Sequence, residues 1–461
     1  MQTKSSKIKK IMIRLTALFA CLMFIGISVP VSADSLYDLP ANTKISAKSA
    51  ILVSLGATPE EDTSLYELQA DSRQSPAALV RLMVGITAIE IIREKGLDIE
   101  KLTGKYTASV FNLFAGTGLA TVQMAYGEEW TVRDLLSISM IQTAADACVT
   151  LAITLSGSQD QFVAKMNELA AKIGCKSTSF ANVTGMDSPS QYTTARDLYK
   201  IVRYAMDYPE FEPLFSAIQY TVKPVSGGSQ RTYATTNDMM RSTTSFYYSP
   251  MSFGKTGYTE SAGRCLASVA RDSGYEYLCI VMGEPNIDDQ GRSGAYFRDT
   301  KTLCHWAFNN FVYQSLLDKG EPRTSIKVNL AWNKDSVSLV AEKGLSAVVI
   351  NGIDRTNTHY KPTLFSQSVN APVKKGQVLG RIELFIKTNQ KIGEVNLVAA
   401  ESVERSNLLA VWAQIESFLS SPWFYAGLVL LLLLLAGYVI LNIVHNRNRR
   451  HRRMKRVRKF H

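Results

Sequence analysis

The stretch that decides the fold is residues 251–283, which read MSFGKTGYTESAGRCLASVARDSGYEYLCIVMG. Within it, the apolar and β-branched runs Met251–Tyr258, Ala262–Ala270 and Tyr277–Gly283 are typical of strands, and glycine-containing turns separate them. Three consecutive strands joined by short turns predict an antiparallel sheet built from successive hairpins. The sequence therefore predicts a domain whose centre is this sheet.

The residues around this stretch combine two early strands with several helices. We expect short strands at Ala50–Leu55 and Leu65–Leu68, and helices at about Pro76–Lys95, Thr131–Met140, Asp160–Ile173, after Thr194 and at about 297–317. Strands come first, helices follow, and further strands close the domain. This order indicates an α+β fold and differs from the strict alternation of a parallel sheet.

The chain is long enough for more than one domain. It has 461 residues, of which 46% are hydrophobic and 20% charged, which is ordinary for packed cores and excludes a disordered or fibrous protein. After Gly320, short apolar strands alternate with turn residues as far as residue 405. We therefore predict a first domain at 34–320 and a small all-β domain at 321–405.

The N-terminus has the composition of a secretory signal. Basic residues precede an apolar run from Leu15 to Val29, and Val31-Ser32-Ala33 is a small-residue cleavage site. We predict a signal peptide at 1–33 that is cleaved after Ala33, with an uncleaved anchor as the alternative. Residue Cys21 is no lipoprotein site, because the apolar run continues beyond it.

The C-terminus predicts a membrane anchor. Residues 423–444 carry no charge, and 22 helical residues span about 33 Å, enough for a bilayer core of about 30 Å. The basic tail at 445–461 has nine Lys and Arg residues, which places it in the cytoplasm and the preceding domains outside. An amphipathic stripe at 406–422 either lies on the membrane surface or extends the span.

Net charge excludes a nucleic-acid-binding body. The formal charge of the whole chain is +11, but residues 1–33 contribute +5 and the tail contributes +9, which leaves −3 for everything between them. The basic character therefore belongs to two short terminal segments, and we expect no nucleic-acid partner. The tail is more simply a topology signal attracted to anionic lipids than a site for an acidic partner.

Cysteine and histidine usage argues against a metal centre. Beyond residue 33 five cysteines occur without C-x-x-C spacing, most of them in apolar runs, so buried thiols are expected, with a 148 to 175 pairing as the alternative. The predicted extracellular part has two histidines, His305 and His359, which disfavours a zinc site or a histidine-dependent triad. We predict neither a metal nor a cofactor.

One motif in the three-strand stretch carries chemistry. Lys255-Thr256-Gly257 is weak evidence alone, but it gains weight from other stretches in chain order: LYELQAD (65–71), SPAALVR (75–81), TVRDLL (131–136), NVTGM (182–186) and YTTARDL (192–198). Together they resemble the D-alanyl-D-alanine carboxypeptidase family of low-molecular-mass penicillin-binding proteins. PVKKG (372–376) and GEVNLVAA (393–400) resemble that family's C-terminal β domain.

The resemblance covers about residues 40–405 and implies a penicillin-binding-protein/β-lactamase-like domain, an antiparallel sheet with helices on both faces. It also implies three motifs, S-x-x-K, S-x-N and K-T-G. In such a set a serine attacks after passing its proton to a lysine one helical turn away, a second serine relays protons, and the K-T-G strand holds the substrate carboxylate.

Two of the three motifs are broken in this chain. The S-x-x-K position reads ALVR (78–81), so Ala78 puts a methyl group where the nucleophile belongs and Arg81 replaces the base with a guanidinium that stays protonated. The S-x-N position reads TAA (143–145), in which Thr143 keeps a hydroxyl and Ala145 lacks the amide. Only K-T-G is intact, so no complete set of catalytic groups is predicted.

Other hydroxyls are poor substitutes for the missing serine. Ser252 and Lys255 have S-x-x-K spacing, but they lie on a predicted strand, where residues three apart point to opposite faces. Ser75 precedes the helix turn and is a weak alternative as a displaced nucleophile. Lys255 and Thr256 are either an ordinary exposed strand end or a carboxylate-binding site, and Arg81 either adds a second cation to that site or blocks it.

We therefore predict a membrane-anchored extracellular relative of serine-type D-alanyl-D-alanine carboxypeptidases that is itself inactive. Its substrate-binding residues would be Lys255, Thr256, Gly257, Thr143 and Arg81. Its partners would be peptidoglycan stem peptides ending in D-Ala-D-Ala, or cell-wall enzymes. The alternatives are an active serine-type carboxypeptidase that uses a displaced hydroxyl, and a structural module of an envelope complex. The sequence makes no prediction of oligomeric state.

Overall fold

The computed structural model describes residues 37–114, 119–386 and 390–457, so the predicted signal peptide lies outside the described residues. The chain divides into two compact units between Val312 and Tyr313. The sequence prediction places the corresponding boundary at residues 320 and 321.

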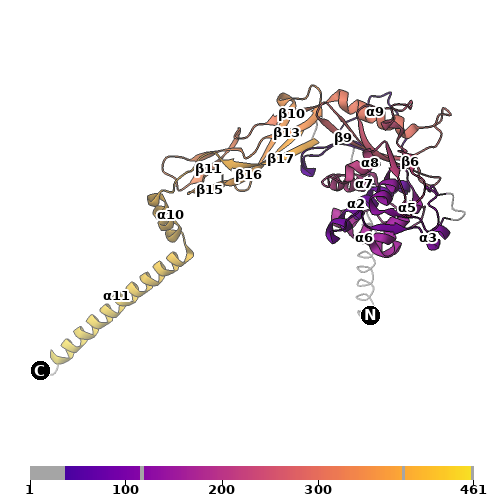
Figure 1. Cartoon of the computed structure of the whole chain (residues 1–461). Helices are drawn as coiled ribbons and strands as arrows, with labels where there is room; N and C mark the ends of the chain where they lie inside the picture. The colour runs from indigo at the N-terminus through magenta and orange to yellow at the C-terminus, as the bar shows by residue number, and fades with distance from the viewer. Residues whose placement is uncertain (1–36, 115–118, 387–389, 458–461) are drawn as a thin grey trace, which may run out of the picture. The chain divides into compact units, whose positions relative to one another are not determined.

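The first unit is built on a five-stranded antiparallel sheet with the order β2-β1-β9-β8-β7 (Figure 1). Its strands are β1 (Ser49–Ser54), β2 (Thr63–Leu68), β7 (Met251–Thr259), β8 (Gly263–Asp272) and β9 (Tyr275–Glu284). The three hairpin strands predicted from the sequence are confirmed, because β7, β8 and β9 pair in sequence order. The two early strands complete the sheet beside β9.

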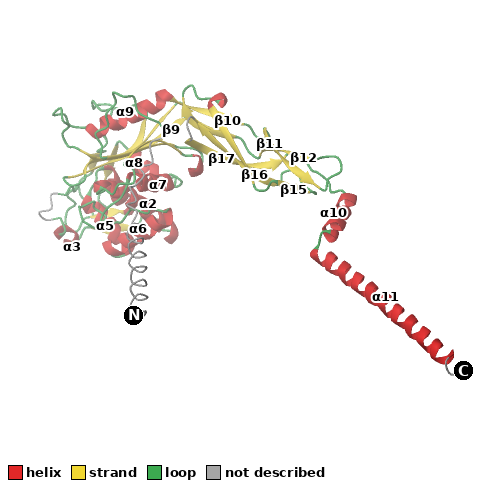
Figure 2. Ribbon diagram, turned by 180° about the vertical axis from the view of Figure 1, so that it is seen from behind, coloured by secondary structure: helices red, strands yellow, loops and turns green. Residues whose placement is uncertain are grey.

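Helices cover both faces of this sheet (Figure 2). One face carries α9, and the other carries a cluster that includes α2, α7 and α8. The helices are α2 (Val80–Lys95), α3 (Ala108–Asn112), α4 (Val132–Ile141), α5 (Ala145–Ser156), α6 (Gln159–Ile173), α7 (Ala195–Ala205), α8 (Phe211–Ser216) and α9 (Ala295–Asn310). The predicted α+β class, with helices on both faces, is confirmed.

Short elements connect these helices and strands. Two-stranded pairs are formed by β3 (Thr103–Lys105) with β4 (Glu129–Thr131) and by β5 (Gln219–Val222) with β6 (Arg231–Ala234). Single 3-10 turns occur at η1 (Pro59–Glu61), η2 (Ala77–Leu79) and η3 (Asp238–Met240).

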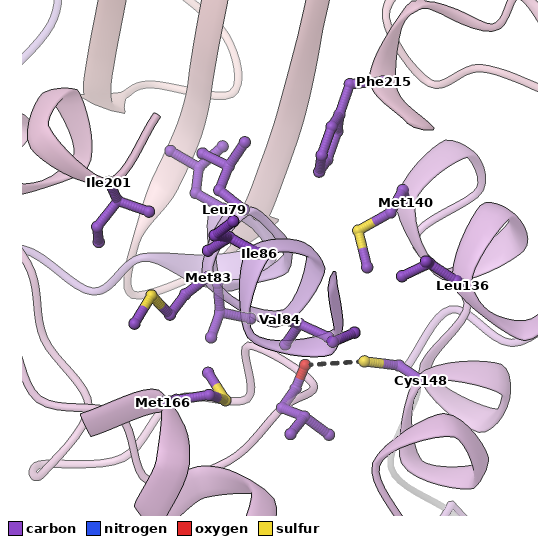
Figure 3. Packing of buried hydrophobic residues seen from close by; sticks show 14 of the residues in the cluster. Leu79, Met83, Val84, Ile86, Leu136, Met140, Cys148, Met166, Ile201 and Phe215 are labelled. Carbon is purple, nitrogen blue, oxygen red and sulfur yellow. Dashed lines mark hydrogen bonds between the residues drawn. The ribbon is translucent and has the colours of Figure 1, made fainter. Parts of the chain in front are cut away.

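Helix α2 lies at the centre of the hydrophobic core. Every residue from Val80 to Ile89 is buried, which is the pattern of a helix surrounded on all sides. Figure 3 shows Met83, Val84 and Ile86 of this helix among side chains from other helices. A helix enclosed in this way holds its first turn in a fixed position, and that turn carries the S-x-x-K position.

Most predicted helix starts are confirmed, and two boundaries were wrong. Thr131 and Thr194 each accept a hydrogen bond from the backbone N–H three residues on, as capping residues do. The helix predicted from Pro76 begins as the 3-10 turn η2 and becomes α2 only at Val80. The helix predicted to reach residue 317 ends at Asn310, because the strand-forming sequence FVYQSLL continues as β10 (Phe311–Leu317).

The second unit is an all-β domain followed by two helices. Its strands after β10 are β11 (Pro322–Asn329), β12 (Ser336–Ala341), β13 (Leu345–Ile350), β14 (Thr358–Leu364), β15 (Ser368–Asn370), β16 (Val378–Ile386) and β17 (Gln390–Ala399), with a 3-10 turn η4 (Arg355–Asn357). Six of them form a sheet with the order β14-β16-β17-β12-β11-β15, while β10 pairs with β13. The predicted small all-β domain is confirmed.

The C-terminal helices are α10 (Asn407–Leu419) and α11 (Pro422–Val457). In the described part of the chain, Pro422–Arg447 is the one helical stretch long and apolar enough to cross a membrane. A break at Ser420 and Ser421 separates it from α10, so the amphipathic stripe forms a helix of its own.

A close approach of backbone fixes the first turn of α2. Gly185, in the loop 182–191, has a φ of +78°, and a Cβ at this residue would overlap the carbonyl oxygen of Ala77. The same loop is ordered by Asn182, whose side-chain oxygen accepts hydrogen bonds from the backbone N–H groups of residues 184–186. Only glycine lets this loop pack against η2.

We therefore expect Gly185→Ala to destabilise the protein more than Gly174→Ala does. Gly174 also has a positive φ, +85°, but a Cβ there would have nothing within 4 Å, so it measures the backbone cost alone, about 1–2 kcal/mol. Overpacking against Ala77 should add about 1–3 kcal/mol at Gly185. Urea denaturation monitored by circular dichroism measures both variants, and equal losses would contradict the close approach.

Candidate functional site

The first turn of α2 presents a methyl group where the family motif has a nucleophile. Ala78 lies in η2 and is buried apart from 7% of its surface. The residue before it, Ala77, has a φ of +45°, in the left-handed region that residues with a Cβ rarely adopt. On the other side, a Cβ at Gly257 of β7 would lie 3.0 Å from the Ala78 nitrogen, so β7 passes directly beside this turn.

Arg81 lies behind this turn rather than at its surface. The residue is completely buried, and its Nη1 donates a hydrogen bond to the carbonyl oxygen of Val183. The thiol of Cys148 donates to the same oxygen at 3.3 Å, the contact drawn as a dashed line in Figure 3. Among the described residues, the Nε of Arg81 has no hydrogen-bond partner. A buried guanidinium cannot contact a ligand, so the binding role suggested for Arg81 finds no support in this arrangement.

Lys255 is buried as well, and its amine faces a hydroxyl. The residue is 1% exposed, and its Nζ donates a hydrogen bond to Thr143 Oγ1 at 2.5 Å and a longer one to Thr236 Oγ1 at 3.4 Å. Burial, with a further contribution from the charge of Arg81, lowers the pKa of Lys255 to about 7. The alternative that Lys255 belongs to an exposed strand end is therefore wrong.

Thr143 is held in a strained conformation. It lies between α4 and α5 with a φ of +65°, a value that is exceptional for a β-branched residue. Such strain costs about 1–3 kcal/mol and persists only where the surrounding structure imposes it. The effect is to direct the Thr143 hydroxyl at Lys255. Ala145, the first residue of α5, is buried and offers a methyl group where the S-x-N motif has an amide.

Two further hydroxyl groups, those of Thr236 and Thr256, connect Lys255 with the surface. Thr256 Oγ1 lies 2.6 Å from Thr236 Oγ1, and both residues are partly exposed. The hydrogen bonds thus form a chain from Thr143 through Lys255 and Thr236 to Thr256. We call Thr143, Thr236, Lys255 and Thr256 the hydroxyl–amine cluster.

Three members of the hydroxyl–amine cluster were predicted from the sequence as site residues, and the fourth, Thr236, was not. That residue lies in a connection before η3, with no motif around it, and reaches the cluster only because Asn237 packs against β7. A Cβ at Gly254 would lie 2.9 Å from the Asn237 amide nitrogen, so the connection approaches β7 closely. The one signal in the sequence was the run of polar residues Thr235-Thr236-Asn237. In the structure these residues are partly or fully buried.

Ser75 does not supply the missing nucleophile. Its hydroxyl donates to the carboxylate of Asp187 at 2.7 Å, and Thr259 Oγ1 donates to the same oxygen at 2.9 Å. The amine of Lys255 instead bonds to Thr143 and Thr236. Ser252 lies on β7, as predicted, and is not on the helix turn that the S-x-x-K motif requires.

We also looked among the described residues for other groups that could bind a ligand or a metal. A hollow of about 490 Å³ lined by residues 125–128, 226–229 and 231 contains no member of the hydroxyl–amine cluster, and its Glu128 and Arg231 form an ion pair with each other. Within residues 37–114, 119–386 and 390–457, no group of three or more His, Cys, Asp or Glu side chains is placed to hold a metal ion. The thiols of Cys148 and Cys175 contact different carbonyl oxygens, so the suggested pairing between them is absent.

Comparisons with known proteins agree on one family. Residues 37–286 match the model of the D-alanyl-D-alanine carboxypeptidase family, and residues 311–405 match that of the C-terminal domain of penicillin-binding protein 5. The D-alanyl-D-alanine carboxypeptidase DacF of Bacillus subtilis is 25% identical over 368 residues, which is 79% of this chain and 87% of that protein. A D-alanyl-D-alanine carboxypeptidase of Streptomyces is 30% identical over 236 residues, 49% of this chain and 78% of that protein.

Solved structures share the fold. Penicillin-binding protein 5 from Haemophilus influenzae has a TM-score of 0.62 at 24% identity, covering 80% of this chain and all of that one. The D-alanyl-D-alanine carboxypeptidase DacD from Francisella tularensis has a TM-score of 0.63 at 19% identity, covering 83% of this chain and all of that one.

The lowered pKa of Lys255 makes stability depend on pH. Its folded pKa is about 7, against a usual 10.5, so between these values the unfolded chain binds a proton that the folded chain lacks. The free energy of unfolding should therefore rise with pH across this window, by up to about 1.4 kcal/mol per pH unit from this residue. Urea denaturation at about pH 7.5 and about pH 9.5 measures the rise, which Lys255→Met should reduce.

Lys176→Met is the matched control, because Lys176 is an exposed lysine outside the hydroxyl–amine cluster. It should leave the pH dependence unchanged. If wild type and Lys255→Met showed parallel pH dependence, Lys255 would not be held neutral in the folded protein.

Proposed function

Because this chain belongs to the D-alanyl-D-alanine carboxypeptidase family, which works in cell-wall metabolism, we propose that it is a catalytically inactive member that binds peptidoglycan stem peptides ending in D-Ala-D-Ala. Enzymes of the Ser-Lys kind form a bond between the serine oxygen and the acyl group of the substrate. This chain offers the methyl group of Ala78 at that position, and a methyl group cannot attack a carbonyl carbon.

The observation that carries this proposal is the pair of changes at one helix turn. Ala78 removes the nucleophile, and Arg81 removes the base that would receive its proton. Arg81 is also buried and hydrogen-bonded to Val183, so it is a fixed part of the core and not a mobile group near the substrate. Loss of nucleophile and base together usually costs many orders of magnitude in rate.

Binding is supported by the hydroxyl groups that surround Lys255. Thr143, Thr236 and Thr256 are partly exposed and carry hydroxyls that can donate to a carboxylate, and Lys255 lies directly behind two of them. A carboxylate placed on these hydroxyls would favour the protonated form of Lys255, because opposite charges attract. Hydrogen bonds to charged groups contribute more than neutral ones, about 1.5–3 kcal/mol each.

We also propose that the protein is a single-pass membrane protein with its two folded units outside the cell. The apolar Pro422–Arg447 stretch supports the span, and the cations that follow it favour a cytoplasmic tail. The separate helix α10 exposes Leu408, Trp412 and Phe418, which supports a position on the membrane surface over a simple extension of the span.

Binding to a D-Ala-D-Ala peptide tests the proposal. We expect weak binding that Lys255→Met reduces by about 1–3 kcal/mol, roughly 5- to 150-fold in Kd, because the variant removes the amine that donates to Thr143 and Thr236. We also expect wild-type affinity to fall as pH rises above 7, where Lys255 loses its proton. Isothermal titration calorimetry measures both effects, with Lys176→Met as the control variant.

If no peptide binds to wild type or to Lys255→Met, the proposed ligand is wrong. That result would favour the alternative of a structural module in an envelope complex, or of a protein that binds cell-wall enzymes through another surface. Equal binding to both proteins would instead place the peptide away from the hydroxyl–amine cluster.

A second candidate function rests on one contact. Thr143 Oγ1 lies 2.5 Å from an amine whose pKa is about 7, and a hydroxyl next to a neutral amine is the arrangement of Ser-Lys type catalysis. Thr143 could therefore serve as a displaced nucleophile. Against this, the family resemblance assigns that position to proton relay, a role that exists in addition to the nucleophile and does not replace it.

Labelled penicillin separates the two candidates. Covalent label that survives denaturing electrophoresis requires an acylated side chain, so we expect no label on wild type. Label that Thr143→Val abolishes and Ser75→Ala does not would establish the second candidate and overturn the first. The double variant Ala78→Ser with Arg81→Lys restores the missing pair and should gain label, which would show that the probe reaches this position.

A further inference from the structure

The hollow of about 490 Å³ in the first unit lies outside the hydroxyl–amine cluster. It is formed by the turn 125–128 before β4, and by residues 226–229 together with Arg231, the first residue of β6. Tyr126 is one of its lining residues and is 75% exposed. Among the described residues, neither the ring nor the hydroxyl of Tyr126 has a partner. A large aromatic side chain left open at a hollow is typical of a surface that contacts a ligand.

The walls of this hollow are tied together by contacts within the protein. The buried carboxylate of Glu128 forms an ion pair with Arg231 and accepts a hydrogen bond from the backbone N–H of Ala125 at 2.7 Å. The guanidinium of Arg231 also lies 5.1 Å from the centre of the Trp130 ring, within the range of a cation–π contact. On the opposite wall, Ser226 Oγ accepts a hydrogen bond from the backbone of β4 at 3.0 Å. The hollow is therefore formed before any ligand binds.

The charges around the hollow cancel, which limits the kind of ligand that fits it. Its two charged lining residues, Glu128 and Arg231, neutralise each other, and the adjacent Glu129 pairs with Lys105 at 3.4 Å. An anion would compete with Glu128 for Arg231, and a cation would compete with Arg231 for Glu128. The other polar groups are the serine hydroxyls and glycine backbone of residues 226–229. This set fits an uncharged ligand rich in hydroxyl and amide groups.

We propose that this hollow binds an N-acetylated amino sugar of the peptidoglycan glycan chain, to which stem peptides are attached. The inference rests on the proposed binding of stem peptides and adds a sugar site to it. One face of a sugar ring carries C–H groups and is apolar, so it can pack on the ring of Tyr126 and leave water. The hydroxyl and acetamide groups at the edge of the sugar then bond to residues 226–229 and to the Glu128–Arg231 pair.

Two segments connect the hollow with the hydroxyl–amine cluster. Strand β6 begins at the hollow with Arg231, and the chain reaches Thr236 of the cluster two residues after this strand ends. A second segment runs beside β6: the hydroxyl of Tyr233 donates to the carbonyl oxygen of Val122 at 3.2 Å, and Arg231 donates to that of Gln123 at 3.4 Å. The hollow and the cluster therefore lie at the two ends of one pair of adjoining segments.

The separation between them matches the reach of a short peptide. Thr236 is five positions after Arg231, so the Cα atoms of these two residues are at most about 18 Å apart. An extended peptide of about five residues has the same reach. With its terminal carboxylate on the hydroxyl–amine cluster, a stem peptide would bring its other end, which carries the sugar, to the hollow. Two linked contacts of this kind bind the whole ligand more tightly than either part.

Titration of the full-length chain in detergent with a soluble N-acetylglucosamine oligomer that carries no peptide tests the proposal. Ligand-observed NMR measures the binding. We expect saturable binding that Tyr126→Ala weakens roughly 5- to 10-fold and that Tyr126→Phe retains, because the phenyl ring offers the same apolar face. Since Tyr126 is mostly exposed, both variants should keep the wild-type circular dichroism spectrum.

Tyr247→Ala is the matched control, because Tyr247 is another exposed tyrosine and does not line the hollow. It should bind the oligomer as wild type does. Absence of saturable binding to wild type would overturn the proposal. Equal binding by wild type and Tyr126→Ala would overturn it as well, because the oligomer would then bind somewhere else.

Failure of the sugar site is distinguishable from failure of the proposed function. Lys255→Met should leave oligomer binding unchanged, and Tyr126→Ala should leave the affinity for a free D-Ala-D-Ala peptide unchanged. Peptide binding without oligomer binding would refute the sugar site alone, whereas oligomer binding without peptide binding would refute the stem-peptide ligand alone. A stem peptide still attached to its disaccharide should bind wild type more tightly than the free peptide does, and Tyr126→Ala should remove that gain.

Discussion

Two basic residues, Arg81 and Lys255, are buried close together in the core of the first unit. This constraint determines the protonation and the hydrogen-bond partners of Lys255. Burying one unpaired charge is already costly, and burying two of the same sign is costlier. The guanidinium of Arg81 keeps its proton, so the amine of Lys255 is the group that loses its proton more easily. Lys255 accordingly has a lowered pKa and is surrounded by hydroxyls in place of a carboxylate. Lys255 is thus a buried hydrogen-bonding group whose amine loses its proton near neutral pH.

The backbone around these cations has the features of a reactive site without its reactive group. Ala77 and Thr143 both occupy the left-handed region, and Gly185 and Gly257 bring two other segments against the turn that contains Ala78. Strain of this kind is usually associated with function, because surrounding packing must impose it. Here the packing of α2 and β7 imposes it on a turn whose side chain is a methyl group. The strained backbone therefore surrounds a position, Ala78, that has no nucleophile.

Much of the fold could be predicted from the sequence because its signals are local. The hairpin strands from Met251 to Gly283 follow from apolar runs and turn glycines, and capping threonines fix the starts of α4 and α7. The broken motifs were visible as residue identities at Ala78 and Arg81. The strand β10 was missed because its residues continue the apolar pattern of α9, and only pairing with β13 makes it a strand.

The site itself depends on contacts that sequence distance conceals. Lys255 meets Thr143 across 112 residues, and Thr236 reaches β7 from a connection that carries no motif. Lys255 is buried only because these distant segments pack around it. The sequence alone therefore could not predict whether its side chain is exposed.

The most direct test of the central claim is the release of D-alanine from a D-Ala-D-Ala peptide by the full-length chain in detergent. The Bacillus subtilis relative serves as the positive control. The account predicts no release above that of buffer, because no side chain at Ala78 can form an acyl intermediate. Release that grows with protein concentration and disappears in Thr143→Val would contradict it, and would mean that the hydroxyl–amine cluster is a working active site.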